Sequence, residues 1–118
     1  MIRVKRIYDP PSKNDGARFL VDRLWPRGLS KGAAGGIRWL KEVAPSDALR
    51  RWFAHDPLKW NEFRRRYAEE LDVKPEAWAP LLRAAEHGPL TLLFAAKNEQ
   101  ANNAVALKIY LESHVKQG

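Results

Sequence analysis

The segment VDRLWPRG, at residues 21–28, has the densest group of side chains that could do chemistry. It places Asp22, Arg23, Trp25 and Arg27 directly after an apolar pair. A guanidinium group suits bidentate binding of an oxyanion, and an indole ring can stack on a base or on the face of a sugar. A proline and a glycine in this segment make the chain turn, which should hold Arg27 outward. The segment therefore predicts a binding site for an anionic ligand.

Two of these side chains have a structural explanation as well as a functional one. Asp22 alternates with Leu20 and Leu24, so it can face the interior, where an ion pair with an arginine or a lysine would keep its carboxylate charged. The functional alternative for Asp22 is to act as a base or to orient the ligand. Trp25 can cover the core or stack on a ligand, and the sequence leaves both interpretations open.

A second polar segment follows residues 90–96, the most apolar run of the chain. It begins at Lys97, and Asn98 is expected to cap the final helix. A helix N-terminus presents unpaired N–H groups and the positive end of a dipole, which attract anions. Ligands of open α/β sheets bind beyond the carboxyl ends of the strands. We therefore expect Lys97 and Asn103 to line one cleft together with the two arginines of the first segment.

His55 and Asp56 form a third candidate group. Histidine is the side chain best suited to proton transfer near neutral pH, but His55 could instead pack on Trp60. Asp56 precedes Pro57, the pattern of a helix N-cap followed by a first-turn proline, and contact with a ligand is its alternative role. Asp22 and His55 are therefore the candidate catalytic residues, and Asp56 is a candidate ligand contact.

The composition excludes several kinds of chemistry. The chain has no cysteine, which removes disulfides, thiol catalysis and thiolate metal sites. No spacing of histidines and carboxylates indicates a metal site, and no serine lies in a nucleophile-elbow pattern. The glycine-rich residues 32–36 lack the Gly-Lys-Ser/Thr ending of a phosphate loop. We therefore expect neither a metal nor a cofactor, and whether the protein is an enzyme stays open.

The net charge of +7 is unevenly distributed along the chain. Residues 1–66 contain 16 basic and 7 acidic side chains, whereas residues 67–118 contain 5 and 7. A positive field attracts phosphates, nucleotides and nucleic acids. The favoured partner is a small phosphorylated or nucleotide-like ligand. The alternative is a nucleic acid bound by the basic half, although its run Arg64, Arg65 and Arg66 is more typical of a solvated helix face.

Strand-like segments alternate with helical ones. Residues 2–8 alternate apolar and basic side chains, residues 19–24 form a second strand, and residues 90–96 have the continuous apolar character of a central parallel strand. Residues 37–43 fit a strand or a short helix, and we favour the strand. This order predicts a small α/β fold with a mostly parallel sheet, helices on both faces and a Rossmann-like three-layer arrangement.

Local signals mark the helices between these strands. Ser46 and Asp47 indicate a helix start, and Pro80 is expected to restart a helix after a turn at Pro75. The helix after Asp56 has an apolar stripe of Trp60, Phe63, Tyr67 and Leu71. No linker divides residues 1–118, so we expect one domain.

Two absences bear on the location of the protein. No apolar run approaches the length of a membrane span, and the first residues have no signal-peptide pattern. We expect a cytoplasmic protein with no membrane partner, and the oligomeric state stays open.

Four stretches together resemble one family. They are VDRLWPRG, WLKEVAPS at 39–46, LRRWFAHDP at 49–57 and LLFAAKNEQANNAVAL at 92–107. Together they are similar to the YeaO-like branch of the "domain of unknown function 488" family, over nearly the whole chain. The resemblance implies a small Rossmann-like α/β domain, cytoplasmic and bacterial, and implies no activity. It marks as site candidates Asp22, Arg23, Trp25, Pro26, Arg27, His55, Asp56, Lys97 and Asn103.

Overall fold

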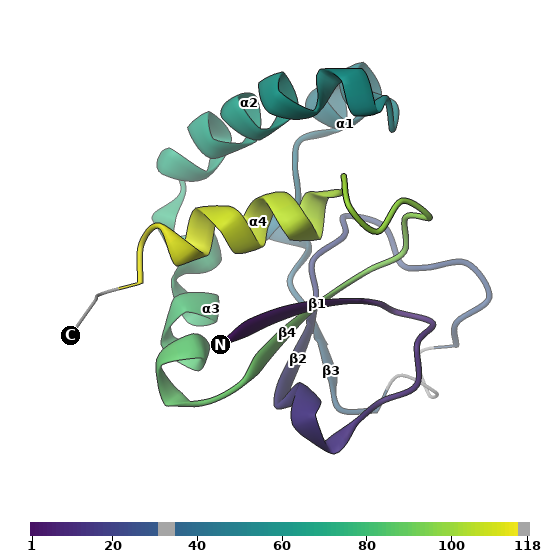
Figure 1. Ribbon diagram of the computed structural model, residues 1–118, viewed down its shortest axis with the longest axis vertical. Helices are drawn as coiled ribbons and strands as arrows, with labels where there is room; N and C mark the ends of the chain where they lie inside the picture. Colours follow the sequence, from purple (N-terminus) through teal and green to yellow (C-terminus); the bar gives the residue numbers. More distant parts are fainter. Residues whose placement is uncertain (31–34, 116–118) are drawn as a thin grey trace.

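Four parallel strands form the sheet on which the molecule is built (Figure 1). The computed structural model describes residues 1–30 and 35–115, so part of the glycine-rich segment lies outside the described residues. The strands are β1 (Ile2–Arg6), β2 (Ala17–Leu20), β3 (Ile37–Trp39) and β4 (Leu90–Phe94). Their order across the sheet is β1-β4-β2-β3, and every neighbouring pair is parallel.

Strand β4 is the centre of the sheet, as its apolar run predicted. Leu90 pairs with Ile2 of β1 on one side and with Ala17 of β2 on the other. All five residues of β4 are buried, because a parallel strand with neighbours on both sides and layers on both faces has no exposed surface. The carboxyl end of β4 therefore opens between the ends of β1 and β2.

Helices follow the local start signals of the sequence. The α-helices are α1 (Asp47–Phe53), α2 (Trp60–Asp72), α3 (Pro75–His87) and α4 (Asn103–Glu112). Short 3-10 helices are η1 (Lys13–Asp15), η3 (Lys41–Val43) and η4 (Pro57–Lys59). Ser46 caps α1 by accepting a hydrogen bond from the Leu49 N–H, and Asp56 caps η4 in the same way from Leu58.

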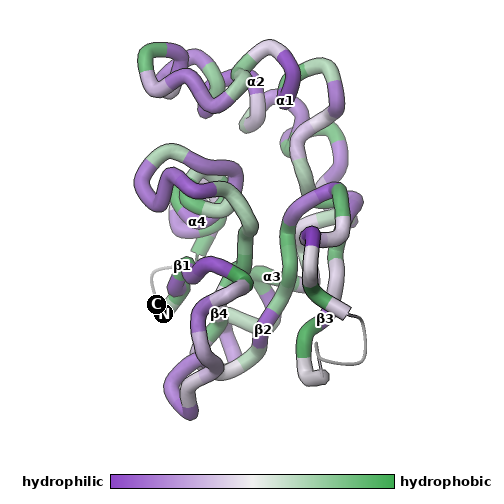
Figure 2. Tube along the Cα trace, turned by 90° about the vertical axis from the view of Figure 1, so that its right-hand side faces the viewer, coloured by the Kyte–Doolittle hydropathy of each residue, from purple (hydrophilic) through white to green (hydrophobic). Residues whose placement is uncertain are grey.

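The four α-helices pack on one face of the sheet. Leu90, Leu92 and Phe94 of β4 share one large buried cluster with core residues from all four helices. In Figure 2, α1 and α2 lie at the top, α4 below them and the strands at the bottom. Burial of these side chains supplies the main driving force for the fold.

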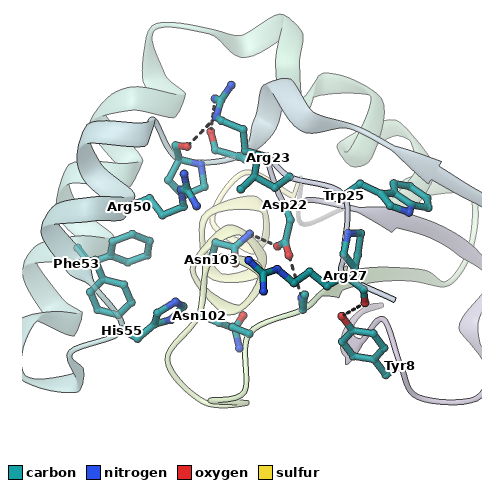
Figure 3. A pocket seen from close by; sticks show the side chains of 17 residues that line it. Tyr8, Asp22, Arg23, Trp25, Arg27, Arg50, Phe53, His55, Asn102 and Asn103 are labelled. Carbon is teal, nitrogen blue, oxygen red and sulfur yellow. Dashed lines mark hydrogen bonds between the residues drawn. The ribbon is translucent and has the colours of Figure 1, made fainter. Parts of the chain in front are cut away.

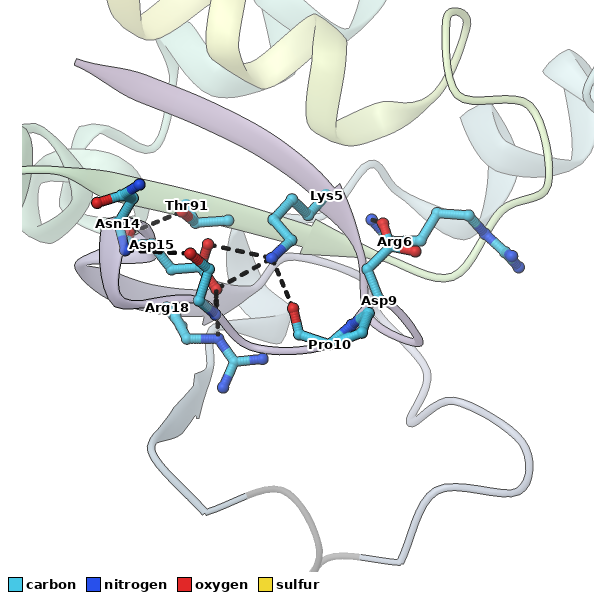
Figure 4. Close-up of polar contacts among 9 residues, drawn as sticks. Lys5, Arg6, Asp9, Pro10, Asn14, Asp15, Arg18 and Thr91 are labelled. Atoms are coloured by element: carbon cyan, nitrogen blue, oxygen red, sulfur yellow. Dashed lines mark hydrogen bonds and ion pairs between the residues drawn. The ribbon is translucent and has the colours of Figure 1, made fainter.

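The opposite face of the sheet has a thinner cover. Leu20 and Leu93 form a second buried cluster there, against which Trp25 and Trp39 pack. Helix η1 also contacts this face, where the Asp15 carbonyl accepts a hydrogen bond from the Thr91 hydroxyl at 2.7 Å. Figure 4 shows how Lys5 and Arg18 surround the Asp15 carboxylate on this face. The predicted small α/β fold, with a parallel sheet between two layers and helices on both faces, is confirmed; the helix on this second face is the short η1.

Two of the helix expectations were wrong. Helix α3 runs from Pro75 to His87 without a break at Pro80, since this proline loses only the hydrogen bond to the carbonyl of Glu76 in the first turn. Leu81, which is fully buried, holds that part of the helix against the core.

The final helix also begins later than expected. Asn98 accepts hydrogen bonds from the N–H groups of Gln100 and Ala101, which closes a local turn instead of a helix. Asn102 is the actual cap of α4, because its side chain accepts from the Val105 N–H at 2.9 Å. Both asparagines are good cap residues, and their sequence context does not separate them.

All four strands also end earlier than expected. Strand β2 ends at Leu20, so Asp22 lies beyond the strand and its direction is not set by strand alternation. Residues 37–43 contain both expected elements, the strand β3 and then the 3-10 helix η3.

Candidate functional site

A cavity of about 490 Å³ opens beyond the carboxyl ends of the strands. Its lining comes from the segments after β2 and β4, from the segment between η3 and α1, from α1 and from the N-terminus of α4 (Figure 3). This is the edge at which ligands bind in open α/β sheets. Its volume lies within the usual range of small-molecule sites.

The two polar segments that the sequence singled out meet in this cavity. One Asp22 carboxylate oxygen accepts a hydrogen bond from the Ala95 N–H at 2.9 Å. The Asn103 side-chain amide donates to the other carboxylate oxygen and to the Val21 carbonyl, both at 3.0 Å. Residues some eighty positions apart are therefore joined at the floor of the cavity.

Asp22 is held by neutral donors. It makes no ion pair with any residue in the described part of the chain, so the buried ion pair considered as its structural explanation is not found there. Burial raises the pKa of the Asp22 carboxyl, while the hydrogen bonds from Asn103 and Ala95, then the charges of Arg50 and His55, act in the opposite direction. The net pKa is above its ordinary value.

Three arginines line the same cavity. Arg23 is largely structural, since its guanidinium donates to the carbonyls of Pro45 at 3.2 Å and Ala44 at 3.3 Å. Arg50, on α1, also forms an ion pair with Asp47 at 3.1 Å. Arg27 is exposed, and its guanidinium has no hydrogen bond or ion pair with the residues that the structure describes. Figure 3 shows its side chain reaching toward Asp22 and Asn103.

Trp25 and Tyr8 shape the rim on the side of Arg27. The Trp25 ring packs edge-on against Trp39 with 5.3 Å between centroids, and its indole N–H donates to the Leu29 carbonyl at 2.6 Å. These contacts favour the core-covering interpretation of Trp25. The Tyr8 hydroxyl donates to the Arg27 carbonyl at 3.0 Å, which fixes the backbone that carries Arg27.

His55 lines the cavity from the other side. It is exposed, and its backbone lies in the left-handed region, with φ of 58°, directly after Ala54 with φ of 47°. Its ring packs beside Phe53, at 6.4 Å between centroids, and not on Trp60, which was the structural alternative to proton transfer. Non-glycine residues in this region are uncommon, and they concentrate at functional sites.

Two of the sequence candidates lie outside the lining. Asp56 caps η4 through its 3.0 Å hydrogen bond from the Leu58 N–H. Lys97 is exposed and does not line the cavity, because the turn at Asn98 separates it from the start of α4. A ligand role for Lys97 and Asp56 stays a prediction.

Several lining residues were not identified from the sequence. Arg50 and Tyr8 are the most important of them, together with the buried ring of Phe53. The available signal for Arg50 was its spacing of three residues from Phe53, which places both on neighbouring parts of one helix surface. Nothing in the spacing of Tyr8 connected it to Arg27.

The basic run on α2 is mostly compensated by carboxylates. Arg65 forms ion pairs with Glu62 at 2.5 Å and with Glu69 at 2.6 Å, and Arg66 pairs with Glu62 at 2.9 Å. The guanidinium of Arg66 also lies 4.2 Å from the centroid of the Trp52 ring. The run therefore does not present three unpaired cations on α2.

Residues 1–30 and 35–115 hold neither a metal-binding cluster nor a membrane-spanning helix. These residues contain no group of three histidine or carboxylate side chains placed to hold a metal ion. They also contain no helix that is long and apolar enough to cross a membrane.

The fold and the cavity define a small α/β protein with a polar site at the carboxyl edge of a parallel sheet. The chain belongs to the DUF488-N3i family, described as the inactive DUF488-N3 subclade, whose model matches residues 1–118. The resemblance to the YeaO-like branch of the domain of unknown function 488 is thereby confirmed.

Similar proteins are themselves uncharacterised. The chain is 42% identical over 112 residues to the uncharacterized protein YeaO of Escherichia coli strain K12, covering 95% of this chain and 97% of that protein. It is 38% identical over 106 residues to Mb3100c of Mycobacterium bovis and to Rv3073c of Mycobacterium tuberculosis strain H37Rv, covering 90% of this chain and 89% of each relative. No solved structure matches the chain.

Proposed function

We propose that this protein binds a small phosphate-containing anion in the cavity at the strand ends and does not turn it over. The observation that carries the proposal is the guanidinium of Arg27, which has no partner among the described residues and reaches into the cavity (Figure 3). Guanidinium groups bind phosphate through paired, charge-assisted hydrogen bonds. The cytoplasmic location expected from the sequence is compatible with such a ligand.

The balance of charge in the cavity supports an anionic ligand. Arg23, Arg27 and Arg50 line it, whereas Asp22 is the one carboxylate among its described lining residues. Burial disfavours the charged form of that carboxylate. Positive charge is therefore in excess at the rim, and partial exclusion of water strengthens its attraction for an anion.

Binding without turnover is favoured over catalysis. Asp22 and His55 line the same cavity, which is an arrangement that could support acid–base chemistry. The matching family, however, is described as inactive. The catalytic alternative predicts release of phosphate from a phosphate ester at a rate that depends on both side chains.

The test is calorimetric titration with inorganic phosphate and a panel of phosphate esters. Arg27→Gln should weaken binding by about tenfold or more, since it removes charge-assisted hydrogen bonds to the anion. Arg51→Gln is the matched control, because Arg51 is also an exposed arginine but does not line the cavity. It should leave the affinity unchanged.

Two outcomes would contradict the proposal. The first is no heat of binding with any phosphate compound. The second is an equal loss of affinity in the Arg27 and Arg51 variants, because the cation would then act through net charge and not through contact with the ligand.

A further inference from the structure

We propose that Asp22 is a specificity-determining residue that selects phosphate esters carrying a hydroxyl group. The ligand is then a sugar phosphate or a nucleotide, and not inorganic phosphate or a simple alkyl phosphate. This inference rests on the proposed function, because it assumes that an anion enters the cavity.

The argument begins with the hydrogen-bonding capacity of the Asp22 carboxylate. Its two oxygens offer about four acceptor positions. The Ala95 N–H occupies one position and the Asn103 amide another. Both donors are neutral, and Asp22 lines the cavity. The Asp22 carboxylate therefore has acceptor positions left for a ligand. No cation among the described residues forms an ion pair with it.

A phosphate group is poorly suited to the part of the cavity directly beside Asp22. Two negative groups repel each other strongly where water is partly excluded. A ligand that places its phosphate at Arg27 must therefore present a hydrogen-bond donor to Asp22. A hydroxyl group is such a donor, and a hydrogen bond to a charged acceptor is stronger than one between neutral groups.

The size of the cavity supports a ligand larger than phosphate. Its volume of about 490 Å³ is in the range of sites for organic molecules. Ala44, Pro45 and Phe53 form apolar parts of the wall. These side chains offer no hydrogen bonds, so the polar groups of the ligand have to be matched at Asp22 and at the arginines.

The aromatic rings at the cavity indicate that a sugar phosphate can make the main contacts without a nucleobase. Trp25 is partly buried by its contact with Trp39, and Phe53 is 5% exposed, so both rings offer limited area for stacking a base. Tyr8 already has the Arg6 guanidinium at 5.1 Å from its ring centroid. A nucleobase should add little to the affinity, since stacking needs an accessible ring face.

The first experiment uses wild-type protein and three probes: methyl phosphate, ribose 5-phosphate and adenosine monophosphate. Ribose 5-phosphate should bind about tenfold more tightly than methyl phosphate, because it can donate to Asp22. Adenosine monophosphate should bind about as tightly as ribose 5-phosphate. An adenosine monophosphate affinity far above that of ribose 5-phosphate would contradict the inference, because contacts with the base and not the hydroxyl group would then determine selection.

The second experiment repeats the titrations on Asp22→Asn. Loss of the negative charge should tighten methyl phosphate binding and weaken ribose 5-phosphate binding, so that the ratio of the two affinities falls toward one. Asp56→Asn is the matched control: Asp56 does not line the cavity, and asparagine is an equally good helix cap. That variant should keep the wild-type ratio.

The outcomes separate the inference from the function on which it rests. If no probe binds to wild-type protein, the proposed function fails. If methyl phosphate and ribose 5-phosphate bind equally well, the function stands and the selection by Asp22 is refuted. A ratio that stays at the wild-type value in folded Asp22→Asn also refutes it. The wild-type comparison decides the matter even where that variant does not fold.

Discussion

Strand β2 is flanked by two aspartates that have opposite surroundings. Asp15 precedes the strand and is 2% exposed. Its carboxylate lies 3.1 Å from the Lys5 ammonium and 3.6 Å from the Arg18 guanidinium, and it accepts a hydrogen bond from the Ser12 N–H at 3.0 Å (Figure 4). Asp22 follows the strand and has neutral donors in the cavity. Each aspartate lies near basic residues, but only the first has its charge compensated by ion pairs within the described chain.

The pKa values of the two carboxyls reflect this difference. Burial raises the pKa of Asp15, but the Ser12 N–H, the Lys5 hydrogen bond and the nearby charges bring it below the ordinary value of 3.8. The pKa of Asp22 lies above 3.8, because burial outweighs its hydrogen bonds. The charge of Asp15 is therefore compensated by its own chain, and this cluster serves stability. The Asp22 carboxylate has hydrogen-bond acceptor positions left, which a ligand can use.

The largest change in stability should come from Asp15→Ala. The change removes the partner of Lys5 and the capping box of η1, and we expect a loss of about 3 kcal/mol in the free energy of unfolding. Denaturant titration measures it. Asp47→Ala, at an exposed ion pair, should cost about 1 kcal/mol or less. Equal losses in the two variants would show that the Asp15 cluster is not a special source of stability.

Asn103→Ala should have an intermediate effect. It leaves the Val21 carbonyl and one Asp22 oxygen without the amide donor, so we expect a loss of about 1–2 kcal/mol in stability. The preference for ribose 5-phosphate should also fall, because Asp22 loses a group that orients it. Asn61→Ala, at an exposed position on α2, should change neither quantity. Unchanged ligand preference in Asn103→Ala would mean that Asn103 has a purely structural role.

The pH dependence of stability should have opposite sign at the two aspartates. The contribution of Asp15 is present above the unfolded pKa near 3.8 and is lost as the pH falls through its lowered folded pKa. The contribution of Asp22 is present below 3.8 and is lost as the pH rises through its raised folded pKa. Denaturant titrations from about pH 3 to about pH 7 on Asp15→Asn and Asp22→Asn should each remove one of these slopes. Slopes of the same sign would contradict the assignment.

The smallest effect should be at Arg65, on the exposed surface of α2. Hydrogen bonds from Arg65 and Arg66 lower the pKa of Glu62 to about 2. Because these charges already compensate one another in solvent, Arg65→Gln should alter neither phosphate affinity nor the unfolding midpoint. Gel shifts with DNA and RNA at two ionic strengths test the alternative function, in which the basic run on α2 binds nucleic acid. Salt-steep retention that is lost when Arg64–Arg66 are reversed in charge would favour the nucleic-acid alternative.

Much of the fold follows from local patterns. The apolar run at residues 90–96 identified the central strand, and Ser46 and Asp56 marked two helix starts through their capping side chains. Such signals depend on neighbouring residues only, so they can be interpreted from sequence. The expectation at Pro80 was wrong because the buried contact of Leu81 outweighed the preference of proline to end a helix. The expectation at Asn98 was wrong because this residue closes a local turn instead of capping a helix.

The candidate site was predictable in part. The sequence placed Asp22 and Asn103 at the ends of two strands, and parallel pairing brings such ends together. It could not indicate that Arg50 lines the cavity while Lys97 lies outside the lining. Both outcomes depend on where α1 packs and on how the chain turns after β4.

By itself, the sequence determined the alternation of strands with helices and the position of the central strand, and it placed acidic and basic side chains at strand ends. These properties arise from periodicity, capping and composition, which act over a few residues. Tertiary structure alone decided which aspartate is neutralised. Ion pairing requires oppositely charged groups within a few ångströms, and the distance from Lys5 to Asp15, or from Arg27 to Asp22, is set by packing of the whole sheet and not by positions along the chain.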